Sequence, residues 1–100
     1  VDVYTDANPA HTDVNFYIKH DRPDAMATIS VQVFDLMGKL VWQTTLAGQS
    51  DMFISSPINW NLCDMAGRRV NRGIYVYKAS ISTNGQEFTS AARKLAVAAQ

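Results

Sequence analysis

The sequence predicts an all-β fold, and more specifically a β-sandwich. Apolar residues alternate with polar ones along several short stretches, which is typical of strands that bury one face. Turn residues such as glycine, asparagine and aspartate separate these stretches, as they do in sandwich domains. Residues 60–77, WNLCDMAGRRVNRGIYVY, show the whole pattern, with strand, turn, strand and a second turn. Nothing in this pattern indicates chemistry.

Six stretches are expected to be strands, because apolar residues occupy every second position in each. They are residues 14–18, 29–34, 40–46, 58–62, 73–81 and 93–97. The apolar positions of a stretch share one face and are expected to form the core. These positions are Val14, Phe16, Ile18, Ile29, Val31, Val33, Leu40, Trp42, Leu46, Ile58, Trp60, Leu62, Tyr75, Tyr77, Ala79, Ile81, Leu95 and Val97.

Turn and loop signals lie between these stretches. Pro23 has no backbone N–H to give to a ladder, so residues 20–25 are expected to form a loop. Residues 47–56 also indicate a loop, although 52–54 fit a short edge strand. The pair Asn84-Gly85 predicts a two-residue hairpin, since both central positions of that turn favour positive φ.

A short motif occurs twice, as DLMGKLV at residues 35–41 and as DMAGRRV at residues 64–70. Asp-rich turns can hold calcium, but an ion needs several oxygen ligands and each copy offers one carboxylate. A tight turn explains the motif better, because aspartate can cap it and glycine can take the left-handed conformation. We therefore expect two tight turns and no metal.

The alanine-rich tail, residues 90–100, favours a helix by propensity alone. A helix this short is marginal in water without packing, and the apolar residues form no stripe. Leu95 and Val97 fit a period of two, so we expect a final strand there.

The 100 residues suffice for one domain, and 47% of them are hydrophobic, as in ordinary folded chains. We expect residues 1–100 to be a single sandwich domain with an ordered core over about 8–97. The start at Val1, without an initiator methionine, suggests a piece excised from a longer protein. Nine basic and nine acidic side chains cancel, which argues against a nucleic-acid partner. Apolar runs of only a few residues argue against direct membrane insertion.

Few residues are candidates for catalysis. Cys63 is the single cysteine, which excludes an internal disulfide and a multi-cysteine metal site. As a nucleophile it would need His11 or His20 as its base, and both lie near the start of the chain. Glu87 is the only glutamate, and the common catalytic and phosphate-binding motifs are absent. We expect Cys63 to be a small buried residue, and the chain to be no enzyme and to bind no cofactor.

Two segments, VQVFDLMGKLV at residues 31–41 and INWNLCDMAGRRVNRGIYVYKA at 58–79, resemble the fold first described in flagellar hook-capping proteins. The hallmark of that family is W-x-x-x-D-x-x-G-x-x-V-x-x-G-x-Y. The chain matches it at Trp60, Asp64, Gly67, Val70, Gly73 and Tyr75. The resemblance implies an immunoglobulin-like β-sandwich of about seven antiparallel strands.

The same fold serves as the C-terminal domain of proteins exported by the type IX secretion system of Bacteroidetes-type bacteria. Three features resemble that branch: the pair Asn8-Pro9, the run VNFYIKHDRP at 14–23, and the basic-then-apolar strand 93–97. The sequence of residues 59–82 looks most like that of the C-terminal domain of the system's surface sortase. The resemblance implies an exported protein at the outer membrane or cell surface. The catalytic residues of a sortase parent would lie before Val1.

The resemblance also implies a function, that of a signal and docking domain. The outer-membrane translocon would recognise the domain, and a shuttle protein of the PorV type would then hold it. The candidate partner-binding residues are Arg93, Lys94, Leu95, Ala96 and Val97. They offer charged and apolar contacts, and an open edge strand can also pair with a partner strand. Leu95 and Val97 can equally complete the core, and exchange of the last hairpin would give a strand-swapped homodimer.

A carbohydrate-binding or adhesive module appended to a secreted enzyme is the alternative function. Aromatic side chains supply stacking surfaces for it. The candidates are Tyr4, Tyr17, Trp42, Trp60, Tyr75 and Tyr77. The alternation along the strands places four of them, Trp42, Trp60, Tyr75 and Tyr77, in the core instead.

Overall fold

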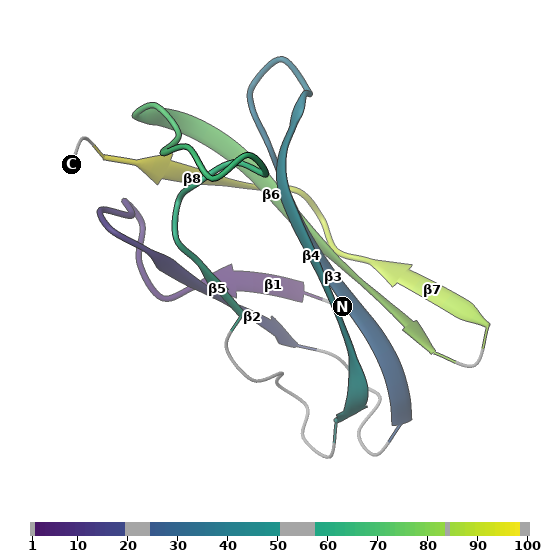
Figure 1. Cartoon of the computed structure of the whole chain (residues 1–100). Helices are drawn as coiled ribbons and strands as arrows, with labels where there is room; N and C mark the ends of the chain where they lie inside the picture. The colour runs from purple at the N-terminus through teal and green to yellow at the C-terminus, as the bar shows by residue number, and fades with distance from the viewer. Residues whose placement is uncertain (1, 20–24, 51–57, 84, 99–100) are drawn as a thin grey trace.

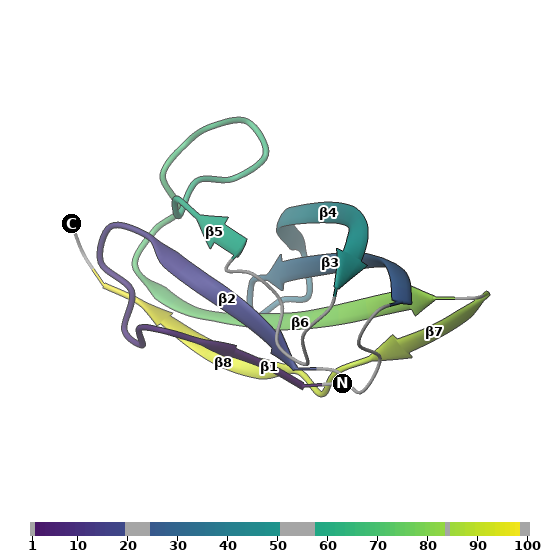
Figure 2. The same cartoon turned by 90° about the horizontal axis from the view of Figure 1, so that it is seen from below.

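Two β-sheets face each other in the computed structural model, which describes residues 2–19, 25–50, 58–83 and 85–98 (Figure 1). The strands are β1 Asp2–Thr5, β2 Val14–Lys19, β3 Ala25–Phe34, β4 Leu40–Ser50, β5 Ile58–Trp60, β6 Gly73–Thr83, β7 Gln86–Thr89 and β8 Arg93–Val97. The smaller sheet has the order β1-β2-β5, and the larger one contains β4-β3-β6. The edge of β6 that faces away from β3 pairs with two strands in turn. β8 pairs with residues 73–77 and β7 pairs with residues 80–83, so these two short strands lie in line along β6 (Figure 2). All these pairs are antiparallel, so the predicted all-β sandwich is confirmed.

The core lies between the sheets and uses the alternating positions of both. The buried apolar residues are Val3, Ala10, Val14, Phe16, Ile18, Val31, Val33, Ile58, Trp60, Leu62, Tyr75, Tyr77, Ala79, Ile81, Leu95 and Val97. All of them except Val3 and Ala10 were expected from the sequence. The period-two pattern therefore identifies the buried face of most strands.

Aromatic rings connect the two sheets through the core. The ring centroids of Phe16 on β2 and Tyr77 on β6 lie 5.2 Å apart. Those of Trp60 on β5 and Trp42 on β4 lie 5.6 Å apart, and Trp60 also meets Tyr75 edge-on at 6.4 Å. Offset and edge-on arrangements of this kind are the favourable ones for aromatic pairs.

Strand β4 differs from the prediction in two ways. It continues to Ser50, so residues 47–50 are strand rather than loop, because they pair with residues 25–28 of β3. Leu40 and Leu46, expected in the core, are 39% and 51% exposed. Leu46, opposite Ile29, lies on the inner face of this edge strand, where the facing β5 has only three residues to cover it. Leu40 is exposed for another reason, because a register shift in β4 pairs it with Phe34, the neighbour of the inward Val33.

The start of the chain and the end of β5 also differ. Val3 is fully buried and β1 pairs along β2, so the packed part begins before residue 8. The described residues thus form eight strands instead of about seven. The strand expected over 58–62 ends at Trp60, because Leu62 takes a φ of 62°, although its side chain remains buried.

The hairpin between β6 and β7 and the strand in the tail are confirmed. Thr83 pairs with Gln86, and Gly85 has a φ of 76°. Ser90 extends this pairing, since its N–H donates to Ala79 O at 2.8 Å. Asn84, residues 20–24 of the loop expected over 20–25 and the short strand considered at 52–54 lie outside the described residues. Ala25, expected in that loop, instead begins β3, where it pairs with Ser50. Across the described ranges, no helix is long and apolar enough to cross a membrane.

Leu95→Ala is expected to destabilise the fold by about 2–5 kcal/mol, because removal of a fully buried side chain leaves a cavity. Lys94→Ala, the neighbouring exposed position, is the control and should change the free energy of unfolding by less than about 0.5 kcal/mol. Urea denaturation measures both. Equally small effects would contradict the place of β8 in the core.

Candidate functional site

Strand β8 separates the candidate partner-binding residues by the face on which they lie. Leu95 and Val97 are 0% and 3% exposed and belong to the core. Arg93 and Lys94 are exposed, and Ala96 is half-buried. The two apolar residues therefore complete the core, and the other three remain accessible to a partner.

Lys94 and Ala96 belong to a mixed strip on the outer face of the larger sheet. Opposite residues of paired strands share a face. Lys94 lies opposite Val76, and Ala96 lies opposite Ile74, which is 42% exposed. Within the described part of the chain, Lys94 makes no ion pair. We call Ile74, Val76, Lys94 and Ala96 the β8 strip.

Arg93 instead contacts the smaller sheet. Its guanidinium donates to Asp2 Oδ1 on β1, from Nη2 at 2.8 Å and from Nε at 3.3 Å. This hydrogen bond is the main cause that lowers the pKa of the Asp2 carboxyl below its ordinary value, and partial burial opposes it. Both side chains are about half exposed, so the pair positions Arg93 more than it stabilises the fold.

The outer edge of β8 is closed, contrary to the expectation of an open edge strand. The Asn8 side chain spans this edge, donating to Lys94 O at 3.2 Å and accepting the Ala96 N–H at 3.0 Å. Ala10 continues this closure. Its N–H donates to Ala96 O and its carbonyl accepts the Ala98 N–H, both at 2.8 Å. These bonds occupy positions that an added strand would need. The sequence singles out Asn8 only through the family resemblance.

Two residues of the family hallmark fix the loop between β5 and β6 to the core. The indole Nε1–H of Trp60, which is fully buried, donates to Cys63 O at 2.8 Å. The Tyr75 hydroxyl donates to Asn71 O at 2.7 Å. Burial is the main cause that raises the pKa of the Tyr75 phenol. Gly73, where β6 begins, has a φ of 152°.

The first copy of the repeated motif forms a hydrogen-bonded turn between β3 and β4. Asp35 Oδ1 accepts the N–H groups of Met37 and Lys39, each at 2.9 Å. The Gly38 N–H donates to Asp35 O at 3.1 Å, and Gly38 has a φ of 86°. The aspartate thus caps the turn and the glycine supplies the left-handed conformation, as expected.

The second copy repeats this geometry between β5 and β6. Asp64 Oδ1 accepts the N–H groups of Ala66 at 2.9 Å and of Arg68 at 3.0 Å, and Gly67 has a φ of 84°. The bond from the Arg68 N–H is the main cause that lowers the pKa of the Asp64 carboxyl. The turn interpretation of the motif is confirmed in both copies.

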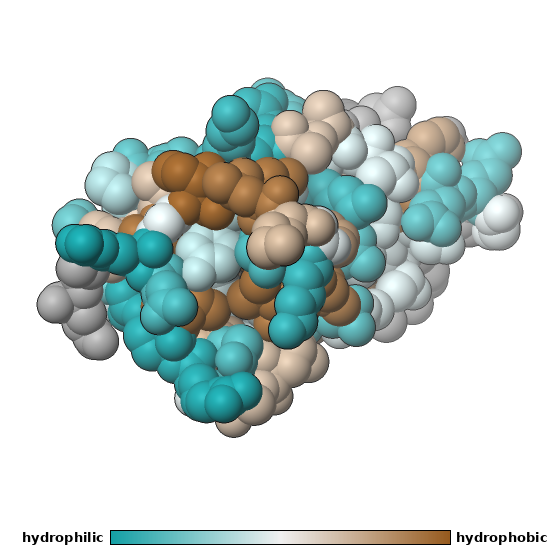
Figure 3. Space-filling model, turned by 90° about the horizontal axis from the view of Figure 1, so that it is seen from above, coloured by the Kyte–Doolittle hydropathy of each residue, from teal (hydrophilic) through white to brown (hydrophobic). Residues whose placement is uncertain are grey.

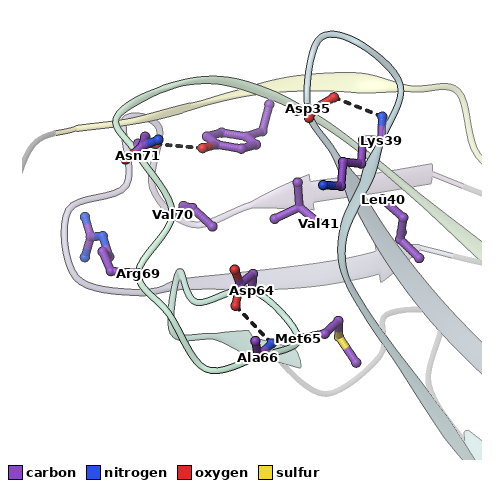
Figure 4. A pocket seen from close by; sticks show the side chains of 11 residues that line it. Asp35, Lys39, Leu40, Val41, Asp64, Met65, Ala66, Arg69, Val70 and Asn71 are labelled. Atoms are coloured by element: carbon purple, nitrogen blue, oxygen red, sulfur yellow. Dashed lines mark hydrogen bonds between the residues drawn. The ribbon is translucent and has the colours of Figure 1, made fainter.

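The two turns face each other across a groove of ≈ 440 Å³ (Figure 4). Lys39, Leu40 and Val41 line it on the β4 side, and Met65 and Val70 line it on the side of the β5–β6 loop. Figure 3 shows apolar side chains gathered in the middle of one face of the molecule and bordered by polar ones. The motif repeat was the signal for the two turns, but nothing local in the sequence brings them together.

Among the residues that the structure describes, the candidate catalytic side chains do not assemble into a site. Cys63 is half-buried rather than buried as expected, and its thiol lies 3.7 Å from Asn61 O. His11 is exposed, and in the described part of the chain no hydrogen bond joins it to Cys63. His20 lies outside the described residues. Within those ranges, no three His, Cys, Asp or Glu side chains are grouped to hold a metal ion.

Three of the six aromatic residues considered for carbohydrate binding are buried in the core. Trp60, Tyr75 and Tyr77 are at most 8% exposed. Tyr4 and Tyr17 are different, because they lie half-buried on the outer face of the smaller sheet. Their rings stack with centroids 5.3 Å apart.

Solved structures match nearly the whole chain. Dimeric latent PorU from Porphyromonas gingivalis is 29% identical, with a TM-score of 0.88 over 99% of this chain and 9% of that chain. The β-glucuronidase of Parabacteroides merdae is 15% identical, with a TM-score of 0.64 over 96% of this chain and 13% of that chain. PorZ, a surface component of the type IX secretion system of Porphyromonas gingivalis, is 24% identical, with a TM-score of 0.53 over 96% of this chain and 11% of that chain. No family model and no curated protein matches the chain.

These similarities support the sandwich fold and part of the family resemblance. The PorU structure matches this chain almost from end to end, which supports the resemblance to type IX secretion proteins in part. The β-glucuronidase and PorZ, at lower identity, support the fold alone. The chain spans only 9% to 13% of the length of these three proteins, so their activities as whole proteins do not transfer to it.

Asn8→Ala is expected to speed amide hydrogen exchange at Ala96 by about tenfold, which is a loss of about 1.4 kcal/mol of local protection. The reason is that the Ala96 N–H loses its acceptor, Asn8 Oδ1. Exchange followed by NMR measures the change. Thr12→Ala, an exposed change in the same connection, should leave Ala96 unaffected. Unaltered exchange in Asn8→Ala would refute the role of Asn8 at this edge.

Arg93→Ala is expected to raise the pKa of Asp2 toward its ordinary value of 3.8. A carboxyl with a lowered folded-state pKa stabilises the fold above the unfolded-state pKa, and that stability is lost as pH falls through the folded-state value. The variant should therefore lose slightly less stability on acidification below about pH 4. NMR titration of the Asp2 carboxyl gives the midpoint. Lys94→Ala is the control and should leave the midpoint unchanged. An unchanged midpoint in Arg93→Ala as well would show that Arg93 does not lower the pKa of Asp2.

Proposed function

We propose that this chain is a non-catalytic signal and docking domain of the type IX secretion system. It directs its parent protein through the outer-membrane translocon, and a shuttle protein of the PorV type then holds it at the cell surface. The observation that carries the proposal is the similarity to PorU, at 29% identity and a TM-score of 0.88 over 99% of the chain. The hallmark from Trp60 to Tyr75 supports the same assignment from the sequence side.

The β8 strip is the surface through which we expect the domain to dock. Lys94 supplies a charge that no described residue neutralises, beside the apolar side chains of Ile74, Val76 and Ala96. Interfaces commonly combine an apolar centre with polar or charged groups around it. Since Asn8 closes the backbone edge of β8, recognition has to use side chains rather than strand addition.

The position of the strip on core strands suits a docking role. Leu95 and Val97 alternate with Lys94 and Ala96 along β8, and they are buried directly behind the strip. A side chain on a packed strand is already ordered before a partner arrives. Binding then costs less conformational entropy than it would on a loop.

Lys94→Glu is expected to weaken binding of the 100-residue chain to a purified PorV-type shuttle protein by about tenfold or more. The substitution reverses the charge of the strip and leaves the core intact. Lys19→Glu, at the exposed end of β2, is the matched control. Biolayer interferometry measures the affinities, and thermal melting checks that both variants fold.

Two outcomes of this experiment would count against the proposal. Equal affinity of the original chain and Lys94→Glu would rule out docking through the β8 strip. No binding by the folded original chain would overturn the docking function itself. Removal of residues 93–100 is a poorer test, because it takes Leu95 and Val97 out of the core. The strand-swapped homodimer stays a prediction that light scattering on the same samples can measure.

A carbohydrate-binding or adhesive module is the second candidate, and the exposed face of the smaller sheet favours it. Beside the stacked Tyr4 and Tyr17, the Asn59 amide donates to Asp13 Oδ2 at 2.8 Å and to Asn15 Oδ1 at 3.1 Å. Polar groups thus lie beside aromatic rings on the smaller sheet. Saturable NMR shifts of Tyr4 and Tyr17 with oligosaccharides would favour this function over docking.

A further inference from the structure

The repeated aspartate turn forms a second surface, which docking through β8 does not use. The first copy joins β3 and β4 of the larger sheet, and the second copy follows β5 of the smaller sheet. The two turns meet across the groove shown in Figure 4. We call this groove the turn groove and define it by Lys39, Leu40, Val41, Met65, Val70 and Tyr75.

A β-bulge places two consecutive apolar side chains of β4 along the turn groove. Phe34 lies opposite Leu40 and Val33 lies opposite Trp42, so Val41 has no opposite residue on β3. In a regular strand, Leu40 and Val41 would point to opposite faces. Here both line the groove, which gives the β4 side an apolar wall.

Exposed apolar side chains concentrate around the two turns. Among the described residues six large apolar side chains are exposed, and four of them lie in or beside the turns. They are Leu36 at 65%, Met37 at 94%, Leu40 at 39% and Met65 at 64%. Clusters of this kind mark interaction sites, and the flexible methionine side chain adapts to different partners.

The acidic groups of the turn groove are already engaged by the chain itself. Asp35 and Asp64 each direct Oδ1 at two backbone N–H groups of their own turn. The Arg69 guanidinium is also engaged, since its Nη2 donates to the carbonyls of His11 at 2.9 Å and Ala98 at 3.1 Å. These hydrogen bonds occupy the polar atoms but leave Asp35 and Asp64 negatively charged, so a ligand carboxylate has to approach Lys39 rather than the two aspartates.

Lys39 is the charged side chain that remains available. It makes no ion pair with the described residues, although its charge contributes weakly to the lowered pKa of Asp64. Figure 4 shows the Lys39 side chain reaching from the β4 side toward Val41 and Val70. Among the described strands β4 pairs only with β3, so none of them occupies the backbone N–H and C=O groups of its outer edge.

We propose that the turn groove binds an extended peptide segment of a partner protein that carries both apolar and acidic side chains. The peptide backbone lies along the outer edge of β4, as in strand addition. Its apolar side chains contact Leu40, Val41 and Met65, and a carboxylate pairs with Lys39. This site goes beyond the docking function proposed above and shares no residue with the β8 strip.

Fluorescence anisotropy with two labelled heptapeptides tests the proposal on the 100-residue chain. In the first peptide valine alternates with glutamate, and in the second lysine replaces every glutamate. We expect the chain to bind the glutamate peptide at least about tenfold more tightly than the lysine peptide. Lys39→Glu is expected to reverse this preference, because it replaces the available cation by an anion.

Two matched pairs of variants locate the site. Met65→Ser should weaken binding of the glutamate peptide by about threefold or more, whereas Met37→Ser, an exposed methionine that does not line the groove, should not. Lys94→Glu, which tests the β8 strip, should leave peptide binding unchanged. Thermal melting checks folding, and all four positions are exposed.

Three results would overturn the inference. One is equal binding of the two peptides, and another is an unchanged preference in folded Lys39→Glu. The third is self-association that Lys39→Glu abolishes while neither peptide binds, which would make a second copy the occupant. A failure here leaves shuttle binding through Lys94 untouched, so the two proposals fail separately.

Discussion

The pairing of β8 with the first half of β6 is the constraint on which the rest of the structure depends. It brings Leu95 and Val97 into the core and aligns β8 with Gly73 through Tyr77. Asn8 and Ala10 then close the other edge of β8, which ties the start of the chain to its end. Because the backbone of β8 is hydrogen-bonded on both edges, its outward side chains are the part of the strand that a partner could contact.

Most of the fold could be predicted, because it follows from local alternation and turn chemistry. The inward positions of β6 and both aspartate turns needed no knowledge of distant residues. The burial of a side chain could not be predicted in the same way. Alternation indicates which face of the sheet Leu46 occupies, but not whether a strand of the other sheet covers that face. β1 has only four residues, too few for a pattern, and the burial of Val3 depends on its pairing with Ile18.

The candidate sites were predictable only in part, for the same reason. The basic-then-apolar run at 93–97 indicates a strand with two kinds of residue, and the structure sorts them by face. The closure of its edge by Asn8 rests on contacts between residues far apart in sequence, which leave no local signal. The turn groove exists because the β3–β4 hairpin and the connection that crosses from β5 in one sheet to β6 in the other both place an aspartate turn along it.

Although the net charge is zero, the described acidic and basic side chains differ in how far they interact with the rest of the chain. Acidic groups are engaged locally: Asp6 accepts the backbone N–H and the amide of Asn15, and its pKa is lowered mainly by that N–H. Asp35 and Asp64 accept backbone N–H groups in the same way. Lys39 and Lys94 make no ion pair with the described residues. The balanced composition excludes a bulk electrostatic field, but at both proposed sites an available lysine lies beside apolar side chains. This local arrangement is the physical basis on which we propose partners with acidic and apolar groups.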